Sequence, residues 1–158
     1  MKVSRRLKDR LYKNMDHLAI LDKKRKLLAK IIAGEKMIES RWYKAKVTPW
    51  DRIKKGEAVY FKESGELVSV RAKVAEVMQF YLPTTDVTRL LQTYRDKICF
   101  EEKDFSKLVA WCSARTYCIL IRLAQVEQIK PFDIDKTGFG MMAAWMTVKN
   151  INSIKKSN

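Results

Sequence analysis

The chain has 158 residues, which is enough for one ordinary domain and too few for two full ones. Hydrophobic residues make up 47% of the sequence, so global disorder is excluded, and the longest apolar run is far too short to span a membrane. The net charge of +15 favours a polyanionic partner, and nucleic acid is the leading candidate.

The cysteines and the histidine narrow the chemistry further. Cys99, Cys112 and Cys118 are odd in number and lack metal-ligand spacing, so we expect reduced thiols in a cytoplasmic protein. His17 is the only histidine, which argues against a His-rich zinc site and against a Ser-His-Asp triad. The basic start is not followed by an apolar segment of the secretory type. We therefore expect no metal, no cofactor and no membrane association.

The first third of the chain carries most of the excess positive charge. Residues 1–55 contain 18 basic and 6 acidic residues, whereas residues 56–158 contain 15 and 12. Residues 3–33 lack Gly and Pro, and Leu7, Leu11, Met15 and Leu18 recur at steps of four and three. This spacing predicts a basic helix that ends at Gly34, and residues 1–31 are predicted to form a helical extension of the domain.

Three roles are open for this predicted helix. Its basic face can contact phosphates, it can be a solvated face with no partner, or it can lie on a membrane surface. The membrane alternative is the weakest, because the segment has no Trp or Phe and no lipidation signal. Docking of a protein partner to this helix is a further alternative.

The rest of the chain alternates between strand and helix patterns. Asp86 or Thr85 is expected to cap the helix that follows Pro83. Strands are predicted at 37–43, 57–62, 67–80, 117–126 and 144–151, and helices at about 85–94 and 103–114. Short and numerous strands close best as a barrel, because closure removes exposed edges. We therefore predict an α+β fold, a mostly antiparallel β-barrel with inserted helices over residues 32–153.

Three segments resemble the ASCH domain of the PUA-like superfamily. Residues 33–41 (AGEKMIESR) resemble its Gly-x-Lys-x-x-Glu-x-Arg signature. Residues 56–65 (GEAVYFKESG) resemble its next strand and turn, and residues 117–145 resemble its C-terminal strands. The match covers about residues 32–151 and leaves the predicted N-terminal helix outside.

The resemblance implies a β-barrel with a cleft beside its helices and a role in RNA binding or its regulation. Some members cut RNA, and some small ones hydrolyse N4-acetylcytidine with a Lys, a Thr and a Glu. By position that lysine is Lys36, whereas the threonine position is occupied by Glu39. Glu101 and Glu102 are near the position of the third member. The departure at Glu39 counts against the amidohydrolase chemistry.

The signature segment supplies the first candidate site residues. Glu39 and Arg41 are two apart on a predicted strand and share a face, and Lys36 is at the strand entry. If they converge, Arg41 can bind a phosphate and Lys36 and Glu39 can act as catalytic groups of an enzyme. Trp42 can stack on an unpaired base. The alternative is a cross-strand charge ladder on a solvated face.

A second set of candidates follows on the next predicted strand and turn. Tyr60 and Lys62 share a face, and Ser64 lies in the turn, so all three are predicted to bind RNA beside the signature residues. Trp111 and Trp145 are in apolar surroundings and are predicted to belong to the core.

We therefore expect an RNA-binding ASCH-type module that engages one nucleotide of single-stranded RNA, or a modified nucleoside, in a Lys/Glu/Arg cleft. A ribonuclease is the first alternative, and an amidohydrolase of N4-acetylcytidine is a less favoured one. A protein-interaction adaptor is the second alternative.

Overall fold

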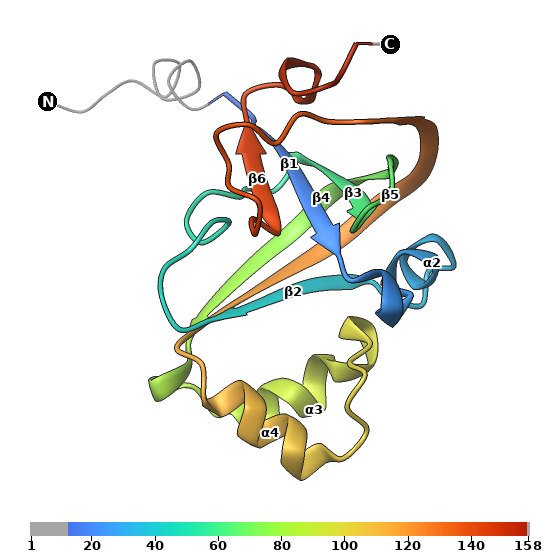
Figure 1. Ribbon diagram of the computed structural model, residues 1–158. Coiled ribbons are helices and arrows are strands. Elements are labelled where there is room, and N and C mark those ends of the chain that lie inside the picture. The colour runs from blue at the N-terminus through green and yellow to red at the C-terminus, as the bar shows by residue number, and fades with distance from the viewer. Residues whose placement is uncertain (1–12, 158) are drawn as a thin grey trace, which may run out of the picture.

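The computed structural model describes residues 13–157 and shows one curved sheet of six strands with helices against it (Figure 1). The strand order is β2-β5-β4-β3-β1-β6. The parallel pair is β1 with β3, and the other neighbouring pairs are antiparallel. The strands are β1 (Asp16–Leu21), β2 (Ile38–Tyr43), β3 (Ala58–Glu63), β4 (Val68–Tyr81), β5 (Tyr117–Phe132) and β6 (Trp145–Val148).

The helices lie on two sides of this sheet. The predicted helices are confirmed as α3 and α4, and Asp86 and Asp104 cap them by accepting hydrogen bonds from the first-turn amides of Arg89 and Lys107. None of the described helices is long and apolar enough to cross a membrane. The helices are α2 (Leu27–Ile32), α3 (Val87–Ile98) and α4 (Phe105–Ser113), with 3-10 turns η1 (Lys23–Arg25), η2 (Leu82–Thr84) and η3 (Ile151–Ser153).

The two longest strands, β4 and β5, pair along most of their length and set the curvature. Along β4, Val68, Val70, Ala72 and Val74 are buried, as the alternation in the sequence predicts. The β4–β5 register shifts at three places, between residues 68 and 70, 71 and 73, and 74 and 76. Bulges of this kind bend a strand and increase its twist, so the sheet curls around its own core.

The sheet curls into a half-barrel, so the prediction of a closed barrel is only partly correct. β2 and β6 stand at the two ends of the strand order. Between these ends, the Arg41 guanidinium donates to the carbonyl of Ala144 at 3.3 Å and lies 5.1 Å from the Trp145 ring centroid. The Arg41 side chain thus connects β2 to the start of β6, where a closed barrel would have backbone hydrogen bonds between these two strands.

The prediction of a continuous helix over residues 3–33 is wrong for residues 16–21. These residues form β1, which lies between β3 and β6 (Figure 1). His17, Leu18 and Ala19 are consecutive and fully buried, because a strand inside a sheet is covered on both faces. Such a strand shows no alternation, so the Met15–Leu18 spacing matched a helical pattern by coincidence.

The predicted boundary at residue 31 would cut β1 away from its own sheet. The predicted helical extension could therefore only precede Asp16, and residues 1–12, where most of it would lie, are outside the described residues. The C-terminal part of the predicted helix agrees better with the structure. The helix α2 ends at Ile32, and Gly34 follows in the left-handed region with φ +79°. Its amide donates to the Ile31 carbonyl, and the turn directs the chain into β2.

Three clusters of buried side chains hold these elements together. One fills the inside of the half-barrel beneath α2 and includes Phe61, Ile119 and Ile121. A second joins α3 and α4 to β2 and the adjacent ends of β4 and β5, and includes Leu91 and Trp42. The third lies under the C-terminal segment around Ile134 and η3. β2 therefore lies at the border between the half-barrel and its helical side.

Candidate nucleotide-binding hollow

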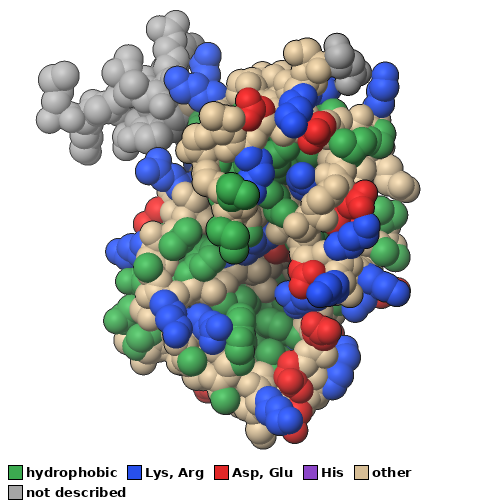
Figure 2. Space-filling view, in the orientation of Figure 1, with side chains coloured by type: hydrophobic (Ala, Val, Ile, Leu, Met, Phe, Trp, Pro, Cys, Tyr) green, Lys and Arg blue, Asp and Glu red, His purple; other side chains and the backbone are tan. Residues whose placement is uncertain are grey.

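A hollow of about 600 Å³ runs along β2, and we call it the β2 hollow. Three parts of the chain form its walls: the end of β1 with η1 and the start of α2, residues Glu39 to Tyr43 of β2, and residues between Phe100 and Trp111 on the helical side. Figure 2 shows a hollow on this face, between the sheet and the two helices below it, with hydrophobic side chains on its walls. Its volume is in the range of ordinary small-molecule sites.

The β2 hollow opens onto the free edge of β2. The β2–β5 register pairs Glu39 with Ile121, and the Leu123 amide donates to the Met37 carbonyl. In an antiparallel pair the residues between such hydrogen-bonded positions direct their backbone groups the other way. The N–H and C=O groups of Ser40 and Trp42 therefore face the hollow, on the side where β2 has no neighbouring strand in the described sheet.

Behind this edge lies a buried cluster of charges. Lys36 and Glu39 are 3% and 4% exposed, and the Lys36 Nζ is 3.6 Å from the Glu39 Oε2. The Arg41 Nε donates to the Glu39 Oε1 at 3.0 Å. Lys36, Glu39 and Arg41 therefore lie together, whereas Lys62, predicted to lie beside them, is not in the wall of this hollow.

Lys36 makes its hydrogen bonds to the backbone. Its ammonium donates to the carbonyl of Ile38 at 2.8 Å and to that of Ile98, the last residue of α3, at 2.7 Å. A cation is favourable at the C-terminus of a helix. Burial lowers the pKa of Lys36 below its ordinary value, and the nearby Glu39 carboxylate opposes this effect. Lys36 thus joins β2 to α3, and it does not line the hollow.

Aromatic side chains form the helical wall. The Trp42 indole donates to the Ser40 hydroxyl at 2.9 Å and lies 5.9 Å from the Phe100 ring. Trp111 is 46% exposed and is covered on one face by the Arg115 guanidinium, 3.8 Å from its ring centroid. The prediction that Trp111 is a core residue is therefore wrong, whereas Trp145 is buried as predicted.

The charged side chains of the walls have mixed signs. Each carboxylate has a partner of its own: for example, Glu39 binds Arg41, and Glu101 is 3.8 Å from Arg25. The basic wall residues are Arg25, Arg41 and Lys107, and the acidic ones are Asp22, Glu39, Glu101 and Glu102. Within residues 13–157, no group of three or more His, Cys, Asp or Glu side chains is placed to hold a metal ion.

Solved structures resemble this chain in fold. The ASCH protein of Zymomonas mobilis has a TM-score of 0.62 at 14% identity, covering 89% of this chain and 96% of the other. A single-substitution variant of that protein gives 0.63, with 87% and 91% covered. This chain has an ASCH-type fold. No family model and no curated protein matches the sequence.

Within this ASCH-type fold the second set of predicted site residues lies away from the β2 hollow. The Tyr60 ring contacts Phe132, at 6.2 Å between centroids, and belongs to the cluster under the C-terminal segment. Lys62 is 9% exposed. The pKa of Glu66 is lowered mainly by Lys23 and that of Asp133 mainly by the Ile134 amide, and the charge of Lys62 adds a small lowering effect to both. Ser64 is exposed in the turn after β3. Alternation along β3 groups Tyr60 with Lys62 as predicted, but β4 and β5 lie between β3 and β2 in the sheet.

The walls of the hollow include residues that sequence reasoning missed. The sequence patterns around Arg25 and Lys107 predict only basic or amphipathic helices, and no pattern marks Phe100 as a site residue. The position of Trp111 on α4 is the sequence signal for its exposure. Leu108 and Cys112 form the buried apolar face of this helix, and Trp111 lies beside that face rather than within it. Only the packing of α4 below β2 makes it a wall residue.

Proposed function

We propose that this chain is an RNA-binding module of the ASCH type and that the β2 hollow takes the base of one unpaired nucleotide. One observation carries the proposal: a hollow of nucleotide size has aromatic walls and a free β-strand edge, in a chain with a net charge of +15. Sequence-specific RNA recognition mostly targets unpaired bases, by stacking and by hydrogen bonds to base edges.

The aromatic wall supplies the stacking surface. Trp111 offers the face that Arg115 does not cover, and Phe100 and Trp42 line the hollow beside it. Stacking of a base on an aromatic side chain contributes about 1–3 kcal/mol and tolerates any base. The opposite wall is the β2 edge, where the backbone groups of Ser40 and Trp42 supply both donors and acceptors to the rim of a base.

The mixed charges of the walls favour a base inside the hollow and phosphates at its mouth. A phosphate inside would lie near the buried carboxylate of Glu39, which lines the hollow and repels it. Base amino groups, in contrast, donate to carboxylates and carbonyls. Arg25 and Lys107 are the cations proposed to meet the phosphates from the rim. Tyr60, Lys62 and Ser64 have no part in this proposal, because they do not line the hollow.

The test is binding of a labelled ten-nucleotide single-stranded RNA, followed by fluorescence anisotropy between about 50 and 200 mM salt. We expect a steep fall in affinity with salt. The Arg25→Gln and Lys107→Gln changes should each weaken binding and reduce the salt slope by about one. Lys73→Gln is the matched control, because Lys73 is exposed on β4 and does not line the β2 hollow. Absence of binding at 50 mM salt would refute the proposal.

Cleavage of RNA is a second candidate function, and the lowered pKa of Lys36 beside Glu39 favours it. Buried ionisable groups with perturbed pKa values cluster at active sites. The test is incubation of the purified protein with end-labelled RNA. Activity that is lost in both Lys36→Met and Glu39→Gln, and kept in Lys73→Gln, would support catalysis, provided that both variants fold. Intact RNA after incubation with the unchanged protein would exclude it.

A further inference from the structure

A second hollow of about 570 Å³ adjoins the first, and we call it the β6 hollow. Its walls come from residues 47–52, from the loop before β6 and from the first residues of β6 itself. Tyr43, the last residue of β2, lines both hollows. Arg41 spans the same border: it lines the β2 hollow, and its guanidinium contacts Ala144 and Trp145, which line the β6 hollow.

The β6 hollow differs from the β2 hollow in charge. Arg52 is the one charged residue on its described walls, and the others are apolar, aromatic, hydroxyl or glycine residues. No carboxylate on these walls opposes an anion. Negative charge is therefore favoured in the β6 hollow, whereas it is disfavoured by the carboxylates of the β2 hollow.

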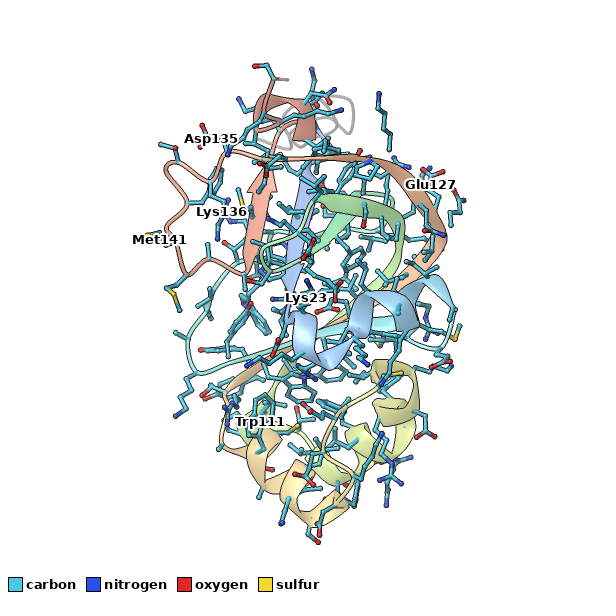
Figure 3. The ribbon with its side chains drawn as sticks, turned by 45° about the vertical axis from the view of Figure 1, so that its right-hand side comes forward. Lys23, Trp111, Glu127, Asp135, Lys136 and Met141 are labelled. Carbon is cyan, nitrogen blue, oxygen red and sulfur yellow. The ribbon has the colours of Figure 1, made fainter. Side chains whose placement is uncertain are left out.

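The loop before β6 presents unusually exposed apolar side chains beside this hollow. Met141 and Met142 are 94% and 95% exposed, and Phe139 is 36% exposed. The loop is nevertheless braced from behind, because the Lys136 ammonium donates to the carbonyls of Met141 and Ala143 at 3.0 and 3.1 Å. Figure 3 shows Met141 at the outer tip of the loop and Lys136 on its inner side, toward β6.

Exposed methionines in a braced loop are typical of a contact surface. Leaving such large apolar side chains in water forgoes the free energy of burying them, so a partner that covers them is favoured. Methionine also packs well against aromatic faces, and its flexible side chain adapts to different ones. Two of the loop's apolar residues, Phe139 and Met142, line the β6 hollow, whereas Met141 does not.

We propose that the β6 hollow binds a second nucleotide of the same single-stranded RNA, so that the RNA runs from the β2 hollow across Tyr43 and Arg41 into the β6 hollow. This proposal rests on the function proposed above for the β2 hollow. Continuity of the two hollows through Tyr43 favours one extended ligand. The isolated positive charge of Arg52 favours the phosphate that links the two nucleotides, and Phe139 and Met142 cover the second base.

The test is a length series of unmodified RNA: a 5′-mononucleotide, a dinucleotide and a tetranucleotide, titrated by calorimetry against the full chain. We expect a gain in affinity of about tenfold or more from one to two nucleotides, as a second stacked base provides. A smaller gain is expected from two to four, because two hollows are filled by two nucleotides.

Two variants identify the site of the second nucleotide. Arg52→Gln and Met142→Ser should each lower dinucleotide affinity about three- to tenfold and reduce the gain in affinity from one to two nucleotides. Met141→Ser is the matched control, since Met141 is equally exposed but lies outside the lining, and it should have the smaller effect. Both methionines are at the surface, so neither change should impair folding.

The outcomes separate the two proposals. Equal affinity for one and two nucleotides would overturn this inference and leave the single-nucleotide function standing. A length effect that is unchanged in Arg52→Gln and Met142→Ser would also overturn it, because the second nucleotide would then bind elsewhere. Absence of binding at every length would refute the function proposed for the β2 hollow as well.

Discussion

Two buried carboxylates in this protein have different surroundings. Glu57 is 1% exposed and accepts hydrogen bonds from the backbone amides of Met15 and Lys54 and from the His17 ring, at 3.0 Å from its Nε2. Glu39 is 4% exposed and accepts one from Arg41, and its Oε2 has no hydrogen-bond partner among the described residues. The Lys36 ammonium is 3.6 Å from that oxygen.

The difference indicates separate tasks for the two clusters. A buried charge is tolerated when hydrogen bonds satisfy its oxygens, and Glu57 meets that condition with hydrogen bonds from three residues. His17 in turn contacts Thr147 and Trp145 on β6, so this cluster joins β1 and β6 to the residue that precedes β3, and neither His17 nor Glu57 lines either hollow. Glu39 is less completely satisfied and lies in the wall of the β2 hollow. Changes around Glu57 should therefore alter stability alone, and changes around the β2 hollow should alter binding.

The largest effect is expected for Glu57→Ala. The change leaves two backbone amides and the His17 ring without their buried partner, so the free energy of unfolding should fall by about 3–5 kcal/mol. Urea denaturation measures it. Glu127→Ala removes an exposed carboxylate that pairs with Arg71 and should change stability by less than about 0.5 kcal/mol. A loss for Glu57→Ala no larger than that of the control would contradict this account.

Lys36→Met is expected to have the next largest effect. It removes the donor to the Ile38 and Ile98 carbonyls, so unfolding should become easier by about 2 kcal/mol. Because the change also frees Glu39 from its nearest ammonium, RNA affinity should change together with stability, unlike in Glu57→Ala. Anisotropy on samples verified as folded by circular dichroism gives the comparison. Unchanged affinity would make Lys36 a purely structural residue.

Trp111→Ala should act on binding and hardly on folding. The loss of one stacking face should weaken RNA binding about 5- to 30-fold, which corresponds to about 1–2 kcal/mol. Stability should change by less than about 1 kcal/mol, because the side chain is half exposed. Tyr81→Ala is the control: Tyr81 is 49% exposed and lines neither hollow. An equal loss of affinity in both variants would remove the β2 hollow from the binding model.

The smallest effect is the pH dependence of stability that arises from His17. Burial lowers the pKa of His17 below its ordinary value of 6.5, and the carboxylates of Glu57 and Asp16 only partly oppose this. The unfolded chain therefore takes up this proton first as the pH falls. The free energy of unfolding is therefore unaffected by the protonation of His17 above about pH 6.5. Below that pH it decreases progressively, until the pH reaches the lower pKa of His17 in the folded protein.

Urea midpoints at pH 7.5, 6.5 and 5.5 measure this slope. In His17→Gln the slope over this interval should be flatter, whatever the absolute stability of the variant. RNA affinity should show no matching step, because neither His17 nor Glu57 lines either hollow. An identical slope in the two proteins would assign the pH dependence to other groups.

Much of the fold could be predicted from local sequence patterns. Strands β2 to β5 follow from alternating or continuous apolar runs, and α3 and α4 follow from their apolar spacing and their Asp caps. The end of α2 follows from Gly34, whose backbone φ of +79° suits glycine. Alternation along β2 also predicts that Glu39 and Arg41 share a face, and the two side chains are hydrogen-bonded, whereas it does not fix the direction of Lys36. In each case the evidence lies within a few residues.

The remaining features depend on contacts between distant segments. The strand β1 owes its conformation to β3 and β6, which cover both of its edges, and its own residues fit a helical pattern equally well. Arg41 and Lys62 are both basic residues on short strands, β2 and β3. The strand order separates these two strands by β5 and β4, which the local sequence around each residue does not reveal. The sequence alone determined a basic ASCH-type fold with a charged signature. Only tertiary packing decided which side chains share a hollow, because strand order and the placement of α4 depend on burial summed over the whole chain.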